Sequence, residues 1–318
     1  MAVLLRLLKN THRFLVWPVL ILFVNQSLQS QQIDTDPYAA GVAYKKEIGR
    51  DVSTWQWNIS VHLPHVTHGV VHSKSMNKDV GYNIYLPPSY AREISKHYPV
   101  VYYCHGASGS ESSDTKVVEY LIPEIESGRI GEVIYVFMNA GHYGGYRDNP
   151  ENNVMAETLV IKEIIPAIES RYRTIPTREG RALMGFSMGG GGATRLALKY
   201  PDLFCAFASF SGALDAHPDS TDTGFNRYFG EDNAYHWATM NQEKLKTEMG
   251  LYFIVGEKDR LYDRHPPFLA HLHSLGISFN YRVQNHMEHK LWEGMDLYGA
   301  EAMHFLASHY EAARTSNN

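Results

Sequence analysis

Several features that would place a chain in a specialised class are absent from this 318-residue sequence. Basic residues are not in excess: 29 Lys and Arg stand against 34 Asp and Glu, so the chain carries no electrostatic footprint for nucleic-acid binding. There is no internal repeat and no low-complexity tract. Cysteine occurs only twice. What is present is ordinary globular composition, in a chain long enough for one large α/β domain.

Long apolar stretches are absent as well. The N-terminal apolar run Phe14–Val24 is about 11 residues, too short to span a bilayer comfortably. Basic side chains precede this run and the polar segment Asn25–Gln32 follows it, an order typical of a secretory signal. We therefore expect a signal peptide over residues 1–30 and a secreted or periplasmic protein, with no stable membrane insertion after cleavage.

An uncleaved membrane anchor is the alternative, because Pro18 interrupts the apolar run and no clean cleavage site follows it. Cleavage would remove Arg6, Lys9 and Arg13 and no acidic residue, so the formal charge would fall from -5 to about -8. A leader over residues 31–60 and a catalytic domain over 61–312 are expected to follow.

Short apolar runs alternate with amphipathic stretches through this domain. Runs such as Val100–Cys104 are typical of strands buried on both faces, and their alternation with helices predicts a mostly parallel sheet with crossover helices. We expect strands at 67–75, 80–86, 100–104, 133–138, 182–186, 206–210, 251–255 and 279–283, and helices at 116–126, 155–171, 193–199, 267–275 and over the C-terminal segment. The polar segment 211–250 is expected to be irregular, as a lid or substrate-binding insertion.

The stretch RALMGFSMGGGGA places Ser187 at the junction of an expected strand and an expected helix. Gly185 and Gly189 remove the neighbouring β-carbons, and this G-x-S-x-G pattern is typical of a nucleophile elbow. A phosphate-binding loop is a poorer reading, since neither G-x-G-x-x-G nor Gly-Lys-Ser/Thr is present. Close packing of the helix on the sheet is a further explanation of the glycines. We predict that Ser187 is a nucleophile.

Ligands of open parallel sheets bind beyond the carboxyl ends of the strands, and the segment His105–Gly109 occupies such a position. Its loop can aim the Ala107 amide at the same point as the Met188 amide, so we predict that these two amides form an oxyanion hole. A tight turn without a catalytic role is the alternative. His105 is expected to brace the loop.

An acid and a histidine follow the last two expected strands. Asp259 comes just beyond the turn after 251–255, where a carboxylate can orient an imidazole, with Glu257 and Asp263 as rivals. His289 and His286 both lie beyond 279–283, and we favour His289 as general base because it directly precedes the apolar start of the last helix.

The chain order of these candidates, serine, then acid, then histidine, is that of α/β hydrolases. We therefore predict an α/β-hydrolase fold with a mostly parallel central sheet and helices on both faces.

Several stretches resemble one known family in combination. They are SKSMNKDVGYNIYLPPSYAREISKHYPVVYYCHGASGS, ETLVIKEIIPAIESRYRT, GFSMGGGGA, VGEKDRLYD and HKLW, within residues 67 to 310. They are similar to the putative-esterase family of α/β hydrolases, which includes feruloyl esterases, enterochelin-esterase-like proteins and S-formylglutathione hydrolases. The resemblance implies a triad of Ser187, Asp259 and one histidine. Relatives have a glycine before the histidine where this chain has Asn285, so His289 and His286 both stay open.

The predicted activity is hydrolysis of carboxylic esters through an acyl-enzyme, on acylated carbohydrate or small esters and without a metal or organic cofactor. Acyl transfer of the mycolyl type, with an alcohol in place of water, is the alternative reaction. A non-catalytic binding module that kept the fold is the alternative from another class.

Three aromatic residues, Tyr143, Tyr146 and Trp292, are candidates for lining the mouth of the site, where ring faces suit sugars or phenolic groups. The histidines between positions 62 and 72 are a possible metal cluster, but we expect a solvated segment because alternate side chains of a strand point to opposite faces.

The two cysteines are expected to stay unpaired. In this fold the strand of Cys104 and the strand after Cys205 flank the elbow strand on opposite sides, roughly 9 to 10 Å apart. A disulfide needs α-carbons within about 7 Å of each other. We predict two buried free thiols.

Overall fold

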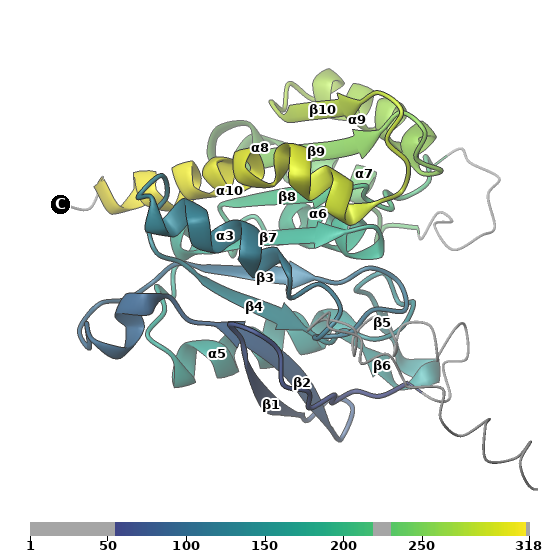
Figure 1. Ribbon diagram of the computed structural model, residues 1–318. Helices are drawn as coiled ribbons and strands as arrows, with labels where there is room; N and C mark the ends of the chain where they lie inside the picture. The colour runs from purple at the N-terminus through teal and green to yellow at the C-terminus, as the bar shows by residue number, and fades with distance from the viewer. Residues whose placement is uncertain (1–54, 219–229, 316–318) are drawn as a thin grey trace, which may run out of the picture. The chain divides into compact units, whose positions relative to one another are not determined.

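A twisted central sheet organises the computed structural model, which describes residues 55–218 and 230–315 (Figure 1). In this part of the chain the sheet has eight strands in the order β1-β2-β4-β3-β7-β8-β9-β10. The strands are β1 (Thr67–Ser73), β2 (Lys78–Tyr85), β3 (Val100–Cys104), β4 (Ile134–Met138), β7 (Arg181–Phe186), β8 (Ala206–Phe210), β9 (Gly250–Gly256) and β10 (Asn280–Gln284). A separate hairpin pairs β5 (Asp148–Asn149) with β6 (Val154–Met155).

The strand directions follow the expected pattern. All neighbours from β4 to β10 pair in parallel, whereas β1 pairs with β2, and β2 with β4, in antiparallel fashion. The prediction of a mostly parallel sheet is confirmed. Because the parallel strands share one direction, their carboxyl ends meet at one edge of the sheet, and the loops that leave this edge lie side by side.

Helices cover both faces of the sheet (Figure 1). They are α3 (Val117–Glu126), α4 (Ala156–Thr158), α5 (Ile165–Arg171), α6 (Met188–Lys199), α7 (Ala234–Met240), α8 (Gln242–Glu248), α9 (His265–Ser274) and α10 (Leu291–Thr315), with short 3₁₀ turns η2 (Pro88–Ala91), η3 (Pro150–Asn152), η5 (Arg178–Gly180) and η6 (Tyr262–Arg264). Alternate strand residues enter two separate cores: Tyr102 belongs to the core that includes residues of α5, α6 and α9, while Tyr103 belongs to the core that includes residues of α3 and α10. Burial on both faces explains why the strands read as continuous apolar runs.

The helix expected over 155–171 is not regular. It consists of α4, the π-helical segment η4 (Leu159–Ile164) and α5. Pro166 is the physical reason, since proline has no amide hydrogen to donate and its ring crowds the preceding turn. The wider π turn accommodates that missing bond.

The segment 211–250 differs from the expectation of an irregular stretch. Its described part contains α7 and α8, and the Asn233 side chain caps α7 by accepting a hydrogen bond from the Tyr235 amide. Tyr235 and Leu245 are buried, so these helices pack on the core rather than cross the surface as loops. The sequence pattern was too short to reveal two helices of seven residues each.

Both cysteines are free and buried, as predicted. Cys104 pairs with Gly185 at the carboxyl end of β7, whereas the amide of Cys205 bonds to the Arg181 carbonyl at the other end of the same strand. The two thiols also belong to different cores, so the sheet lies between them.

The expected signal peptide lies outside the described residues, as does most of the leader. In the part of the chain that the structure describes, every helix is either too short or too polar to cross a membrane.

Candidate active site

Ser187 occupies a sharp turn between β7 and α6. Its backbone has φ 55° and ψ -118°, a conformation that is costly for a residue with a side chain. The turn is held from both sides: the Ser187 amide donates to the Phe210 carbonyl at 2.9 Å, and the Ser187 carbonyl accepts from the Ala213 amide at 2.8 Å. The end of β8 therefore fixes the serine in this strained turn.

The glycines around the serine allow close packing. Helix α6 begins at Met188, not at 193 as expected, so the glycine run lies inside its first turns. A β-carbon at Gly189 would lie only 1.9 Å from the carbonyl oxygen of Cys104, and one at Gly192 would lie 2.4 Å from the ring of Tyr146. Glycine costs a helix about 1 kcal/mol relative to alanine. An alanine at either of these positions would overlap its neighbours, so the close packing of the helix requires glycine.

The structure brings Ser187, His289 and Asp259 together. His289 Nε2 lies 2.8 Å from Ser187 Oγ, and its Nδ1 lies 2.9 Å from both carboxylate oxygens of Asp259. Because a carboxylate only accepts hydrogen bonds, Nδ1 carries the proton and Nε2 accepts from the serine hydroxyl. This chain of hydrogen bonds can move the serine proton to the imidazole.

Asp259 is buried, with a side chain that is 0% exposed. Burial by itself would raise the pKa of its carboxyl group, but hydrogen bonds from His289, Ser211 and the Leu261 amide outweigh burial and hold the pKa below its usual range. Asp259 is therefore ionised beside the imidazole. Ser211 was not among the residues predicted from the sequence, although a polar residue directly after β8 is a usable signal.

Neighbouring strands bring the acid and the histidine together. Gln284 at the end of β10 pairs in register with Gly256 at the end of β9, and the Lys258 amide donates to the Met287 carbonyl at 3.0 Å. The two loops are thus bonded to each other. His286 lies on the same loop but is exposed and does not share the contacts of His289. The imidazole Nδ1 bonds to Asp259, whereas the rival acid Glu257 accepts from the His286 amide and Asp263 lies in η6.

The loop after β3 lies directly against the serine. A β-carbon placed on Gly106 would be 3.5 Å from Ser187 Cβ. Within this loop the Ser108 amide donates to the His142 carbonyl and the Gly109 amide to the Gly106 carbonyl. Among the described residues, the Ala107 amide and the Met188 amide have no such backbone acceptor. These are the two amides predicted from the sequence to face an oxyanion.

His105 is buried at the base of this loop. Its Nε2 accepts a hydrogen bond from the Ala140 amide at 3.3 Å, and its Nδ1 donates to the Gly106 carbonyl at 2.8 Å. Both ring nitrogens bond to backbone, which is how a histidine braces a loop.

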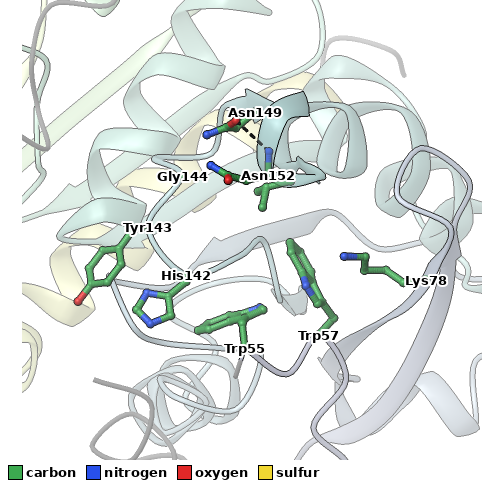
Figure 2. Close-up of a pocket in the computed structure, with 9 residues that line it drawn as sticks. Trp55, Trp57, Lys78, His142, Tyr143, Gly144, Asn149 and Asn152 are labelled. Carbon is green, nitrogen blue, oxygen red and sulfur yellow. Dashed lines mark hydrogen bonds between the residues drawn. The ribbon is translucent and has the colours of Figure 1, made fainter. Parts of the chain in front are cut away.

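A pocket of about 490 Å³ lies next to this loop, and we call it the tryptophan pocket (Figure 2). Its lining includes Trp55, Trp57, Lys78, Tyr143, Asn149 and Asn152. The Ser108 hydroxyl donates to the Tyr143 hydroxyl at 2.8 Å, so the pocket shares a wall with the loop that follows β3, His105–Gly109. The sequence predicts only a leader for the segment that carries both tryptophans, because nothing in a local pattern shows where such a segment folds back.

Of the three aromatic residues proposed for the mouth, Tyr143 lines this pocket and the other two do not. Tyr146 is fully buried: its hydroxyl donates to the His105 carbonyl and its ring fills the space left by Gly192, so that assignment is wrong. Trp292 stacks on Tyr120 of α3, with the two rings 6.4 Å apart. This contact lies on the side of the sheet that α3 and α10 cover.

The histidines expected in a solvated segment make local contacts. His72 pairs with Asp79 across the β1–β2 hairpin at 2.8 Å, with both side chains exposed, and His68 bonds to Asn58 at 2.8 Å. The described residues contain no group of three or more histidines, cysteines or acids arranged to hold a metal.

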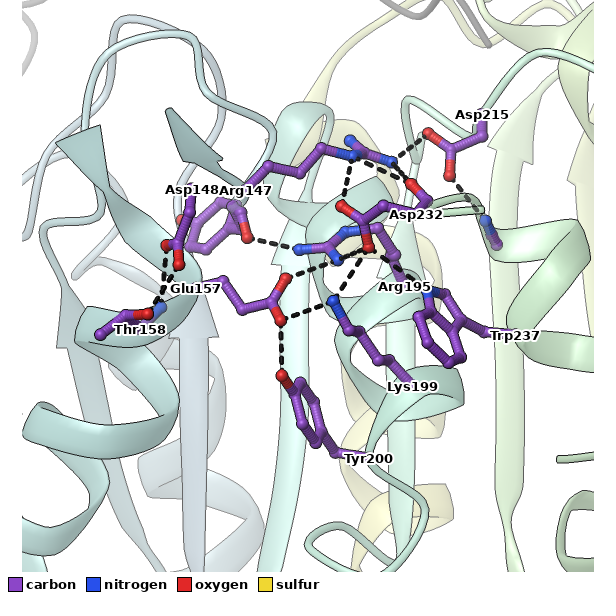
Figure 3. Close-up of polar contacts among 12 residues, drawn as sticks. Arg147, Asp148, Glu157, Thr158, Arg195, Lys199, Tyr200, Asp215, Asp232 and Trp237 are labelled. Carbon is purple, nitrogen blue, oxygen red and sulfur yellow. Dashed lines mark hydrogen bonds and ion pairs between the residues drawn. The ribbon is translucent and has the colours of Figure 1, made fainter. Parts of the chain in front are cut away.

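An ion cluster connects helix α6 to the segments around it (Figure 3). Arg195 of α6 is 1% exposed and contacts Glu157 at 2.7 Å and Asp232 at 2.6 Å. Lys199 bonds to the same two acids, and Arg147 bonds to Asp232 and Asp215. The charges of the cluster balance, as burial requires. The cluster fixes α6 to the loop that carries Tyr143 and to the segment before α7.

Comparison with protein families gives one match over most of the chain. Residues 73–290 match the family described as "Putative esterase". An esterase of Mycobacterium tuberculosis is 34% identical over 170 residues, which cover 52% of this chain and 34% of that protein. A xylanase/feruloyl esterase of Xylanibacter ruminicola is 27% identical over 180 residues, or 52% of this chain and 25% of that protein. The chain thus matches about a third or less of these relatives' length.

Solved structures share the fold. A ferulic acid esterase superposes with a TM-score of 0.68 and 26% identity, over 77% of this chain and 98% of that chain. An S-formylglutathione hydrolase of Agrobacterium tumefaciens gives a TM-score of 0.62 at 18% identity, over 79% of this chain and 99% of that chain. These neighbours are α/β hydrolases, so the predicted fold class is confirmed.

Proposed function

Because the chain belongs to this esterase family, we propose that it hydrolyses carboxylic esters with Ser187 as nucleophile, His289 as general base and Asp259 as the orienting acid. One observation carries the proposal: a single hydrogen-bonded chain joins the three side chains at the carboxyl edge of the sheet. The relatives described above are named as esterases and hydrolases, which supports hydrolysis over acyl transfer.

The proposed reaction begins at the serine hydroxyl. Ser187 Oγ attacks the carbonyl carbon of the ester while His289 Nε2 takes the hydroxyl proton. The negative charge that forms on the carbonyl oxygen receives hydrogen bonds from the Met188 and Ala107 amides, each worth about 3 kcal/mol to the transition state. Ionised Asp259 stabilises the imidazolium and keeps its Nε2 directed at the serine.

The attack produces a tetrahedral intermediate, and its collapse breaks the ester C–O bond. The alcohol leaves with the proton from His289, and the acyl group remains on Ser187. Water then attacks the acyl-enzyme, His289 accepts a proton from the water and returns it to Ser187 Oγ, and the carboxylic acid is released.

The proposed substrates are acylated carbohydrates or small esters, and their feruloyl or acetyl character follows the names of the relatives. We also propose export to the periplasm or the medium, which rests on the basic and apolar segments within residues 1–30. Fractionation of expressing cells and N-terminal sequencing of the exported protein test this: full-length protein retained in the cytosol would contradict it.

Labelling with a fluorophosphonate probe tests the nucleophile. We expect wild-type protein to take up the label and the Ser187→Ala variant to take up none. A panel of acetyl, butyryl and feruloyl esters then identifies the acyl group. A folded wild type that neither takes the label nor cleaves any ester in the panel would overturn the proposal.

A further inference from the structure

The tryptophan pocket has no role in the mechanism above, and four separate segments of the chain contribute to its walls. Trp55 and Trp57 meet edge to face, with ring centroids 6.4 Å apart and planes at 80°. Lys78 Nζ lies 4.9 Å from the centre of the Trp57 ring. Asn149 and Asn152 lie across the pocket from the tryptophans (Figure 2). Its volume is that of a small-molecule site.

The segment that carries the two tryptophans is fixed to the domain. Its residues alternate between half-buried and exposed from 55 to 60, so Trp55, Trp57 and Ile59 face inward. The Asn139 side chain donates to the Gln56 carbonyl at 2.9 Å, and the Ile59 amide donates to Glu111 Oε1 at 2.6 Å.

The segment also bonds to the sheet, because the Gly81 amide of β2 donates to the Trp57 carbonyl at 2.7 Å. The indole rings are thus held in place before any ligand arrives, which lowers the entropy cost of binding.

The pocket is connected to Ser187 through the loop that follows β3, His105–Gly109. Tyr143 accepts from the Ser108 hydroxyl, and the neighbouring His142 carbonyl accepts from the Ser108 amide at 3.1 Å. Gly106 of the same loop lies against Ser187. A group bound in the pocket is therefore placed to belong to the same molecule as the ester under attack.

The lining indicates the chemistry of that group. Indole rings offer flat apolar surfaces, and the asparagine side chains can both donate and accept hydrogen bonds. Lys78 is the charged side chain among the described lining residues, and none of these residues is acidic, so a cationic ligand is disfavoured. A flat or chair-shaped ring with hydroxyl groups at its edge satisfies both parts of the lining.

We propose that the tryptophan pocket binds a hydroxyl-bearing six-membered ring of the ester substrate, with Trp55 and Trp57 as specificity-determining residues. This rests on the proposed esterase function. The ring is either a sugar on the alcohol side of the ester or a phenol on the acyl side, and these two sources share the same recognition chemistry.

Three esters separate the sources when they are assayed with wild type and Trp57→Ala. Ethyl acetate has no ring, an acetylated methyl xyloside carries a ring in its alcohol, and methyl ferulate carries a ring in its acyl group. For at least one ring-bearing ester we expect kcat/KM to fall about 3- to 10-fold more than for ethyl acetate, mainly through KM. Trp57→Phe, which keeps a ring, should recover most of that loss.

If Trp57→Ala loses more kcat/KM on the xyloside, the pocket binds the alcohol part of the ester. If it loses more kcat/KM on the ferulate, the pocket binds the acyl part. Equal losses on all three esters would overturn the proposal. The control is Ile94→Ala, which removes an exposed apolar side chain before β3 and should not discriminate among the esters. Asn152→Ala provides a second test on the opposite wall if Trp57→Ala fails to fold.

Binding without turnover distinguishes failure of this proposal from failure of the esterase function. Calorimetry on Ser187→Ala with methyl β-xyloside and with ferulate should give measurable binding of at least one probe, weakened by added Trp57→Ala. Binding of neither probe overturns the pocket proposal even if wild type cleaves esters. Binding of a probe by a protein that cleaves no ester supports the pocket and overturns the esterase.

Discussion

The imidazole of His289 reaches Ser187 from a loop that lies 102 residues further along the chain, with Nε2 at 2.8 Å from the serine oxygen. His289 also packs against Phe186, the residue before the serine, with ring centroids 4.8 Å apart. The same ring therefore bonds to the proposed nucleophile and packs, in a tilted orientation, on the last residue of the strand that positions it. This places the proton acceptor independently of any bound substrate.

The two histidines of this loop should differ sharply in their effect on catalysis. We expect His289→Ala to reduce kcat for p-nitrophenyl acetate by at least about 10³-fold, because the serine loses its proton acceptor. His286→Ala is the matched control and should stay within about threefold of wild type, since His286 is exposed. A large loss with His286→Ala and a small one with His289→Ala would reassign the base.

Asp259→Asn should lower kcat by about 10⁴-fold while the protein stays folded, because an amide no longer enforces the tautomer that accepts from Ser187. Ester hydrolysis, with circular dichroism as a check on folding, measures this. Asp263→Asn is the control, because Asp263 lies in η6 with a side chain that is not buried. Similar activities for the two variants would remove Asp259 from the triad.

Glu111 should make stability depend on pH. It is buried at the base of the leader segment, and burial raises its pKa to about 7 from an ordinary value of 4.5. Between pH 4.5 and pH 7, Glu111 therefore holds a proton in the folded chain that it has released in the unfolded chain. The free energy of unfolding should therefore fall by about 3 kcal/mol as pH rises from 4.5 to 7.

Glu111→Gln should lose this part of the pH dependence, which urea unfolding at pH 5 and pH 7.5 measures. Glu126→Gln, on the exposed end of α3, should keep the wild-type profile. Parallel profiles for wild type and Glu111→Gln would show that Glu111 does not titrate in this range.

Arg195 should contribute strongly to stability. Replacing it by methionine leaves the cluster with one uncompensated negative charge, while Lys199 stays bonded to Glu157 and Asp232, and we expect a loss of about 3 kcal/mol in urea unfolding. Arg282→Met is the control, because the Arg282–Glu301 pair is about half exposed and should be worth at most about 1 kcal/mol. Equal losses in the two variants would contradict a structural role for the buried cluster.

Gly189 tests the packing of helix α6, with Gly128 as the comparison. Gly189→Ala should prevent stable folding or cost more than about 3 kcal/mol, since its β-carbon would overlap the Cys104 carbonyl. Gly128→Ala has open space around it but a φ of 71°, so we expect a loss of only about 1 kcal/mol. Thermal melts of both variants compare them, and a Gly189→Ala protein as stable as Gly128→Ala would refute the close contact.

The proposed nucleophile, its proposed acid and the strands that carry them were predictable from sequence because their signals are local. Ser187 lies in a glycine-flanked turn, and Asp259 directly follows a buried strand. Apolar runs buried on both faces have a pattern that needs no knowledge of distant neighbours. The alternation of strands and helices then predicts the parallel sheet, since parallel neighbours are joined by crossover connections that usually contain a helix.

The choice between His289 and His286, the burial of Tyr146 and the place of Trp55 were decided only by tertiary structure. Two histidines three positions apart on one loop have the same local pattern, and only the pairing of β10 with β9 determines which one faces Asp259. Tyr146 turns inward because Gly192, far along the chain, leaves it space. Such contacts join residues distant in sequence, and no short-range pattern encodes them.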